Sequence, residues 1–324
     1  MFQFISKLDN VTLSNNYLAC YNTDALNSSF FSVLSKNKDL KKILPRGYKT
    51  ASKILVAPFS ILSDIYFSYI SFVSTLPVTK KNTLNKELSV VFNYDANVTP
   101  IANFLMDPTN QFEICNCVYC DLKRVKGYYD TQGHRQRREF QTDHVLDKGK
   151  CPIIGLSLFN FVPACPDCNS RAHKGTKSLG DNKMESMYLS PTSELNLFCD
   201  EVKFTLNVLN PHILDLKLFE KDEDVEIDFK GATKKYSKTL SIFRLKDRYN
   251  SYKQELIEPI FSMRKYPPTK IQNIAEILEL SEEEIFEDKF QFRKRESNKS
   301  PMEKCRRDLF TEIYGSVDWN HIKG

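Results

Sequence analysis

The sequence lacks the features that would place it outside the cytoplasm. Its first residues, MFQFISKLDN, have no basic segment followed by a sustained apolar run, so we expect no secretory signal. The longest apolar stretch, Ile54 to Pro77, carries Asp64, Pro58 and several serines, which favours a buried helix over a transmembrane span. We therefore expect a cytoplasmic protein without membrane contact.

Repeats, low-complexity tracts and an even set of cysteines are also missing. Nine cysteines in 324 residues without a secretory signal do not fit a disulfide framework. Hydrophobic residues make up 41% and charged residues 27%, which is ordinary for a soluble protein and argues against disorder. The chain is long enough for two or three globular units.

Composition separates three regions. Residues 1–96 are rich in Ser and Asn with apolar clusters, and we expect a mostly helical support. Residues 97–177 hold six of the nine cysteines and three of the five histidines, which marks them as the chemical centre. Residues 178–324 show helical spacing of apolar residues and a capping box at Ser281 and Glu284, which predicts a mostly helical region. The fold class expected is α+β.

The net charge of +5 is concentrated in the middle of the chain. Between Cys115 and Gly175 there are ten Lys or Arg residues against six Asp or Glu residues. Such an excess favours a polyanionic partner, although a solvated basic hairpin would look the same.

Two Cys-x-x-Cys pairs carry the strongest signal in the sequence. Cys117 and Cys120 form one pair, Cys165 and Cys168 form the other, and 44 residues lie between them. Two such knuckles complete a closed tetrahedral zinc site, which leaves no open position for chemistry. A redox pair would need only one knuckle. Cys115 could replace Cys117 on spacing alone, and we expect ordinary buried thiols at the remaining positions, Cys20, Cys151, Cys199 and Cys305.

The segment between the knuckles predicts a small β structure. GYYDTQGHRQRREFQTDHVL indicates a strand, a turn at TQGH, a second strand, and then Asp143 and His144 on a strand rich in β-formers. Asn160 stands just before the second knuckle, and a short helix can begin at that knuckle. We expect a β-hairpin and a helix clamped by zinc.

These residues resemble the HNH endonucleases. That family's ββα-metal finger carries an Asp-His pair, a mid-motif Asn, and a His or Asn directly after the last zinc cysteine, which correspond to Asp143, His144, Asn160 and Asn169. The segments FNYD, FRLKDRYNSY and SPMEKCRRDL extend the likeness to bacterial HNH proteins of anti-phage defence, including nucleases paired with ATPases in Septu-type and retron systems. The likeness is weaker from Phe243 to Leu309 and absent before about Asn93.

The resemblance implies an HNH finger between mostly helical regions and a metal-dependent endonuclease. Such an enzyme hydrolyses nucleic-acid phosphodiester bonds, with DNA as the favoured substrate. RNA or tRNA stays open as the alternative, because the finger contacts the backbone and base readout lies elsewhere. It also implies a role in defence, with an ATPase or another subunit as partner.

Phosphodiester hydrolysis needs a deprotonated water and a cation that takes up negative charge. His144, whose ordinary pKa is near neutrality, is the expected general base. Asp143 points to the opposite side of its strand and is the expected metal ligand. By the resemblance Asn169 is the second ligand and Asn160 bridges the loop backbone to orient His144. An Asp and Asn pair suits Mg²⁺ or Mn²⁺ rather than zinc.

Four further residues keep two interpretations each. His173, one helical turn beyond Asn169, would reach the metal or a phosphate if it is not a surface histidine. Arg171 and Lys174 on the same short helix are either phosphate contacts or a solvated basic face. Asp147 stands where the family usually has Pro, and it either attracts a second cation or is solvated.

A second function class competes with the enzyme. A catalytically inactive zinc-ribbon module would bind nucleic acid and recruit a partner through the helical C-terminal region. Such a module has no reason to combine Asp143, His144, Asn160 and Asn169, so their joint presence favours the nuclease.

Overall fold

The computed structural model describes residues 6–129, 136–191, 197–210, 222–262, 265–266, 268–290 and 300–314. Contacts divide the chain into two compact units, the first made of residues 1–119 and 125–198 and the second of residues 120–124 and 199–324. The fold is α+β, as predicted, with many helices and small antiparallel sheets. Residues 1–96 and 97–177, which composition separates, fall mainly into one unit.

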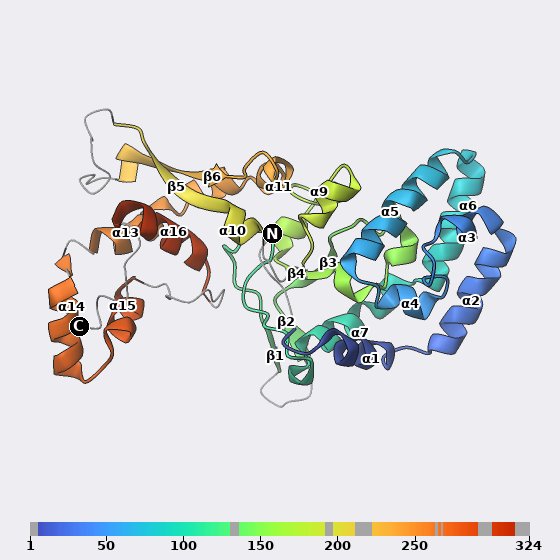
Figure 1. The fold of residues 1–324 in the computed structure, drawn as a ribbon, viewed down its shortest axis with the longest axis horizontal. Helices are drawn as coiled ribbons and strands as arrows, with labels where there is room; N and C mark the ends of the chain where they lie inside the picture. The colour runs from blue at the N-terminus through green and yellow to red at the C-terminus, as the bar shows by residue number, and fades with distance from the viewer. Residues whose placement is uncertain are drawn as a thin grey trace. The chain divides into compact units, whose positions relative to one another are not determined.

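Within its described residues, the first unit begins with seven helices, three of which open on a polar side-chain cap. Asp9 accepts hydrogen bonds from the backbone amides of Val11 and Thr12, and Asn22 and Asn93 cap their helices in the same way. Those three are α1 (Asn10–Leu18), α2 (Thr23–Lys36) and α7 (Tyr94–Met106), and between α2 and α7 lie α3 (Lys38–Ile43), α4 (Ala51–Leu55), α5 (Phe59–Ser74) and α6 (Val78–Val91), all blue to teal in Figure 1.

The apolar stretch from Ile54 to Pro77 is divided at Pro58 into the end of α4 and the whole of α5. Helix α5 packs against α3 and against α9 (Lys183–Met187). Two of its polar residues contact α9, where Asp64 pairs with Lys183 and the Ser63 hydroxyl lies 2.5 Å from that of Ser186. Within the described residues, no helix is long and apolar enough to cross a membrane.

The N-terminal helices join the middle of the chain through buried hydrogen bonds. The Tyr17 hydroxyl donates to the Leu156 carbonyl at 2.9 Å, and the Ser157 hydroxyl donates to the Ile54 carbonyl at 3.0 Å. These bonds explain why the predicted support region and the predicted chemical centre share one core.

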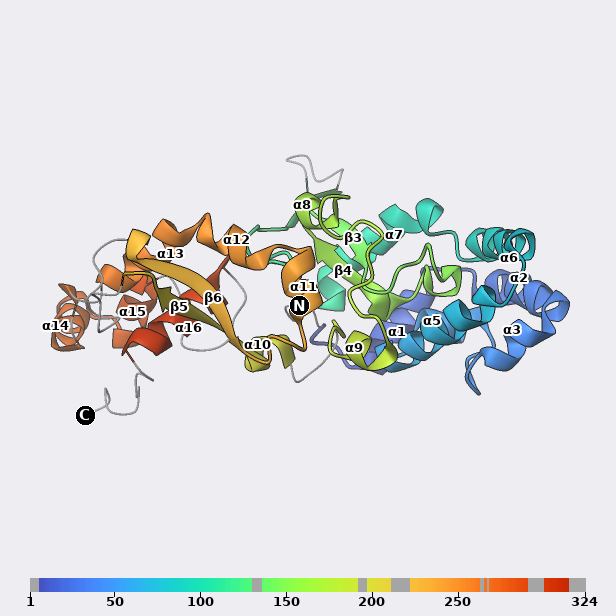
Figure 2. The same ribbon diagram turned by 90° about the horizontal axis from the view of Figure 1, so that it is seen from above.

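Two short antiparallel sheets form the middle of the chain. Strand β1 (Gly127–Tyr129) pairs with β2 (Gln136–Arg138), and the TQGH turn predicted between them lies outside the described residues. Strand β3 (Gln141–His144) pairs with β4 (Phe161–Ala164), which α8 (Pro166–Asn169) follows (Figure 2). The sequence predicted no strand at β4. All four of its residues are buried, so they show no alternation of apolar and polar residues, and Pro163 interrupts the β pattern.

The described part of the second unit contains a hairpin and, after it, a series of helices. Strand β5 (Val202–Val208), which follows α10 (Leu197–Glu201), pairs along its whole length with β6 (Val225–Gly231). The hairpin was not predicted for this region. The helices are α11 (Ser237–Ile242), α12 (Leu245–Asn250), α13 (Lys253–Ser262), α14 (Pro268–Leu278), α15 (Glu282–Phe290) and α16 (Glu303–Tyr314).

Helix side chains cover both outer edges of this hairpin. On the β5 edge, Asp308 and Glu312 of α16 accept from the backbone amides of Phe204 and Leu206, each at 3.0 Å. On the β6 edge, Asn250 of α12 exchanges two hydrogen bonds with the backbone of Ile227, at 2.9 and 2.8 Å. Carboxylates and an amide thus take the place of neighbouring strands.

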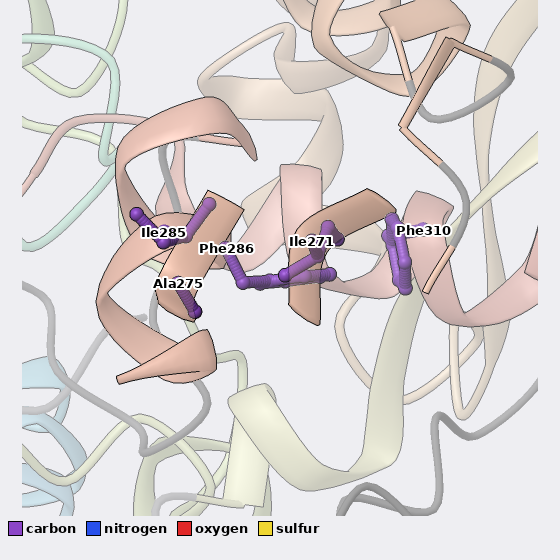
Figure 3. Close-up of a cluster of buried hydrophobic side chains, with 5 residues drawn as sticks. All are labelled: Ile271, Ala275, Ile285, Phe286 and Phe310. Atoms are coloured by element: carbon purple, nitrogen blue, oxygen red, sulfur yellow. The ribbon is translucent and has the colours of Figure 1, made fainter. Parts of the chain in front are cut away.

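Apolar side chains of α14, α15 and α16 form a separate cluster (Figure 3). The Phe286 and Phe310 rings meet edge to face with centroids 5.2 Å apart. The predicted capping box is confirmed at the start of α15, where the Glu284 amide donates to the Ser281 hydroxyl and the Ser281 amide donates to the Glu284 carboxylate. The cluster consists of Ile271, Ala275, Ile285, Phe286 and Phe310.

Candidate functional site

Four cysteine side chains converge as the spacing predicted. The Sγ atoms of Cys117, Cys120, Cys165 and Cys168 lie within 4.8 Å of one another, and all four residues are buried. Tetrahedral Zn–S bonds of about 2.3 Å separate sulfur atoms by about 3.8 Å, which falls within that limit. The Cys165 amide donates to Cys117 Sγ at 3.2 Å, a bond that favours the thiolate. The cluster can hold a zinc ion.

The remaining cysteines have other surroundings. Cys115 is half-buried and outside the cluster, so Cys117 takes the fourth corner. Cys151 and Cys305 are buried, and burial raises the pKa of both thiols. Cys20 is exposed, which corrects the expectation of a buried thiol, and the Cys199 side chain lies outside the description.

His144 is enclosed by aromatic rings at the end of β3. Its exposed fraction is 4%, and its ring meets those of Tyr94 and Phe161 edge to face at centroid distances of 4.5 and 4.9 Å. Its Nε2 atom lies 2.9 Å from the Gly155 carbonyl oxygen. Because a carbonyl only accepts, Nε2 carries the proton of the neutral ring and Nδ1 keeps its lone pair.

Burial changes the chemistry expected of His144. Desolvation lowers the pKa of the imidazole to about 3, with the Lys148 and Lys174 charges adding to that effect and the Gly155 carbonyl opposing it. The near-neutral pKa assumed from the sequence is therefore corrected. The imidazole is neutral at physiological pH, and it is a weaker base than an exposed histidine.

Asn160 closes the loop between β3 and β4. Its side-chain oxygen accepts from the Leu146 amide at 2.8 Å, and its Nδ2 donates to the Leu146 carbonyl at 3.0 Å. Its own carbonyl accepts from the Val145 amide at 2.9 Å. The fully buried side chain therefore ties the residues that directly follow His144 to the start of β4.

Asp143 lies on the other side of the strand in a network of its own. Lys174 Nζ is 2.9 Å from its Oδ2 atom, and the Tyr119 hydroxyl donates to the same oxygen at 2.5 Å. Both partners are buried, and burial followed by the Asp143 charge raises the pKa of Tyr119, which keeps the phenol a neutral donor. The Asp143 carboxylate is therefore paired with the ammonium of Lys174.

As arranged, the predicted ligands do not fit a divalent cation. The Lys174 ammonium already neutralises Asp143, and Asn169 donates from Nδ2 to the Gln141 side-chain oxygen at 2.8 Å. A cation at Asp143 Oδ2 would meet a positive charge at the oxygen it must bind. The structure therefore gives no support to Mg²⁺ or Mn²⁺ at this position.

The residues after the second knuckle differ from the prediction. Helix α8 ends at Asn169, and Ser170 is extended, so half-buried His173 is not one helical turn beyond Asn169. Arg171 is exposed, but Lys174 is 2% exposed, which corrects its assignment to a phosphate contact or a solvated face.

Asp147, the other candidate for a cation site, has a local structural role. Its Oδ1 atom accepts from the Gly149 amide at 2.7 Å, in a short turn of the loop. The next residue, Lys148, places its ammonium 4.7 Å from the centre of the Tyr94 ring and 3.5 Å from Asp95.

Sequence reasoning missed two residues that contact the predicted site and gave a third another role. Tyr119 lies inside the first knuckle and donates to Asp143, and Tyr94 packs on His144 while its hydroxyl donates to the Thr142 carbonyl at 2.8 Å. Lys174, expected at a phosphate or on a solvated face, instead pairs with Asp143. The position of Tyr119 between two zinc cysteines was the one signal available, because any side chain there lies beside whatever the knuckles enclose.

No protein-family model, curated protein or solved structure matches the chain.

Proposed function

We propose that the chain is an HNH-type endonuclease that hydrolyses nucleic-acid phosphodiester bonds, with DNA as the favoured substrate and bacterial anti-phage defence as its setting. Zinc in the four-cysteine cluster would hold the fold and take no part in the reaction. His144 would accept the proton of the attacking water. The support comes from the sequence resemblance and from the geometry around His144.

The observation that carries the proposal is the fixed tautomer of His144. The Gly155 carbonyl holds the Nε2 proton, and Asn160 fixes the loop that follows, so Nδ1 is a pre-oriented acceptor. Because the ring is neutral, it is ready to take a proton at pH 7. The negative charge of a bound phosphate would raise the pKa of the imidazole and strengthen it as a base.

The test uses zinc-loaded protein with supercoiled plasmid and with tRNA, in Mg²⁺, in Mn²⁺ and in EDTA, with zinc measured after each incubation. We expect cleavage by the wild type and none by His144→Ala. Phe161→Leu is the matched control, because it removes ring packing beside the imidazole and leaves the base in place. It should retain cleavage, and equal cleavage by His144→Ala would refute the proposal.

The alternative is a zinc-ribbon module that binds nucleic acid without cleaving it. The buried ion pair between Asp143 and Lys174 favours this alternative, because it fills the position of the expected metal ligand. Nucleic-acid binding by a chain that cuts neither substrate under any of the conditions above would establish it. Such binding should weaken as salt increases.

We also infer that a partner subunit, an ATPase by the sequence resemblance, controls the nuclease. The exposed apolar side chains at the end of α14 support a contact surface there, since Ile277 and Leu278 are 78% and 55% exposed. Co-purification from the native host tests this inference. A chain that elutes alone, is fully active and is harmless when expressed by itself would contradict it.

A further inference from the structure

Lys174 is held under the second knuckle by the fold around it. Its backbone amide donates to the Cys168 carbonyl at 3.1 Å. The next residue, Gly175, has a positive φ of 45° and approaches Arg171 so closely that an added Cβ would lie 3.2 Å from the Arg171 Cα atom. The turn therefore needs a glycine at this position, and the Lys174 side chain before it is buried rather than in solvent.

The inward ammonium meets a carboxylate that the first knuckle also contacts. The side chains of Lys174 and Asp143 are 3% and 10% exposed. Tyr119, from the first knuckle, donates to the same oxygen. Two donors thus reach Asp143 Oδ2 from the two ends of the four-cysteine cluster, and neither of these bonds uses Oδ1.

A divalent ion and the ammonium cannot both be accommodated here without a large repulsion. Mg²⁺ binds carboxylate oxygen at about 2.1 Å. With Lys174 Nζ 2.9 Å from Oδ2, an ion on that oxygen would lie at most about 5 Å from the nitrogen. In a buried site such a charge pair is weakly screened, so binding of an ion at Oδ2 requires the ammonium to move away.

We propose that Lys174 is an internal competitor for the divalent cation at Asp143 and keeps the finger in a cation-free resting state. The inference rests on the proposed function, because it takes Asp143 as the cation ligand of that site. Lys174 does not serve as the reaction's own cation, because an ammonium that is buried and bound to Asp143 cannot reach a phosphate. Divalent binding then requires the ammonium to leave Asp143.

The first test measures Mn²⁺ binding to full-length, zinc-saturated protein by the electron paramagnetic resonance signal of free Mn²⁺. Lys174→Met, which fills the space without charge, should bind Mn²⁺ about tenfold or more tightly than the wild type. Lys177→Met is the matched control, since this neighbouring lysine is exposed and its ammonium donates to the Ala172 carbonyl rather than to Asp143. The Lys177→Met variant should bind Mn²⁺ with the affinity of the wild type. The increase in Mn²⁺ affinity caused by Lys174→Met should disappear in the double variant Asp143→Asn/Lys174→Met.

A second test uses the wild type and so avoids any folding defect of the variant. Lys174 should resist amine acylation, read by mass spectrometry against Lys177, and become reactive at Mn²⁺ concentrations that saturate binding. Equal Mn²⁺ affinity of wild type and Lys174→Met, or unchanged Lys174 labelling at saturation, would overturn the inference. If the protein cleaves nucleic acid but either of these two tests fails, the proposed nuclease function stands and the role of Lys174 is refuted. If both tests succeed but no cleavage is found, the nuclease function is refuted and the role of Lys174 stands.

Discussion

The burial of His144 predicts an acid sensitivity that one substitution should remove. The folded pKa is about 3, against 6.5 for an ordinary histidine, so the unfolded chain binds more protons between these values. The contribution of neutral, buried His144 to the free energy of unfolding is therefore fully present above pH 6.5. It is lost as the pH falls toward 3. Between pH 7 and pH 5 the loss from this group is about 2 kcal/mol.

The assay is urea unfolding at pH 5, 6 and 7 with zinc present, for the wild type and for His144→Gln. The glutamine amide can still donate to the Gly155 carbonyl, but it does not titrate. We expect the wild type to lose about 2 kcal/mol more than the variant across this range. Parallel pH profiles, or an NMR titration of the His144 ring with a midpoint near 6.5, would refute the reasoning.

Three further predictions follow from the same contacts. Metal analysis should find one zinc per folded chain, and Cys165→Ser should lose the metal together with the structure of the finger, because zinc binding is folding free energy. Asp143→Ala should reduce the free energy of unfolding by about 3–5 kcal/mol, because Lys174 is left buried and unpaired, and Lys174→Met in the same chain should recover much of that loss in urea unfolding. Asn160→Ala should cost about 1–3 kcal/mol and accelerate hydrogen exchange at the Leu146 amide, and unchanged exchange there would contradict the role of its side chain in the loop.

The sequence was informative where a short spacing determines local geometry. The two cysteine pairs converge because each knuckle is a tight turn, and the capping box at Ser281 forms because both partners belong to the same helical turn. The division of the apolar stretch at Pro58 follows from the geometry of proline. These features depend on neighbours in the chain.

Other features depend on partners far along the chain. The aromatic enclosure of His144 comes from Tyr94 and Phe161, and the pairing of Asp143 comes from Lys174, so neither can be deduced from motif spacing. The β5–β6 hairpin had a local signal that was overlooked. Buried Val202, Phe204 and Leu206 alternate along β5, as residues do in a strand with one covered face.

The covered edges of that hairpin have a consequence for synthesis of the protein. Strand β5 leaves the ribosome well before α16, whose Asp308 and Glu312 satisfy its outer amides. Until α16 arrives, the outer edge of β5 presents an open template to any extended segment, including the same strand of another nascent chain. The time between the synthesis of the two elements is therefore an interval in which this strand is exposed to misassembly, and a fragment that ends before α16 would keep the edge open.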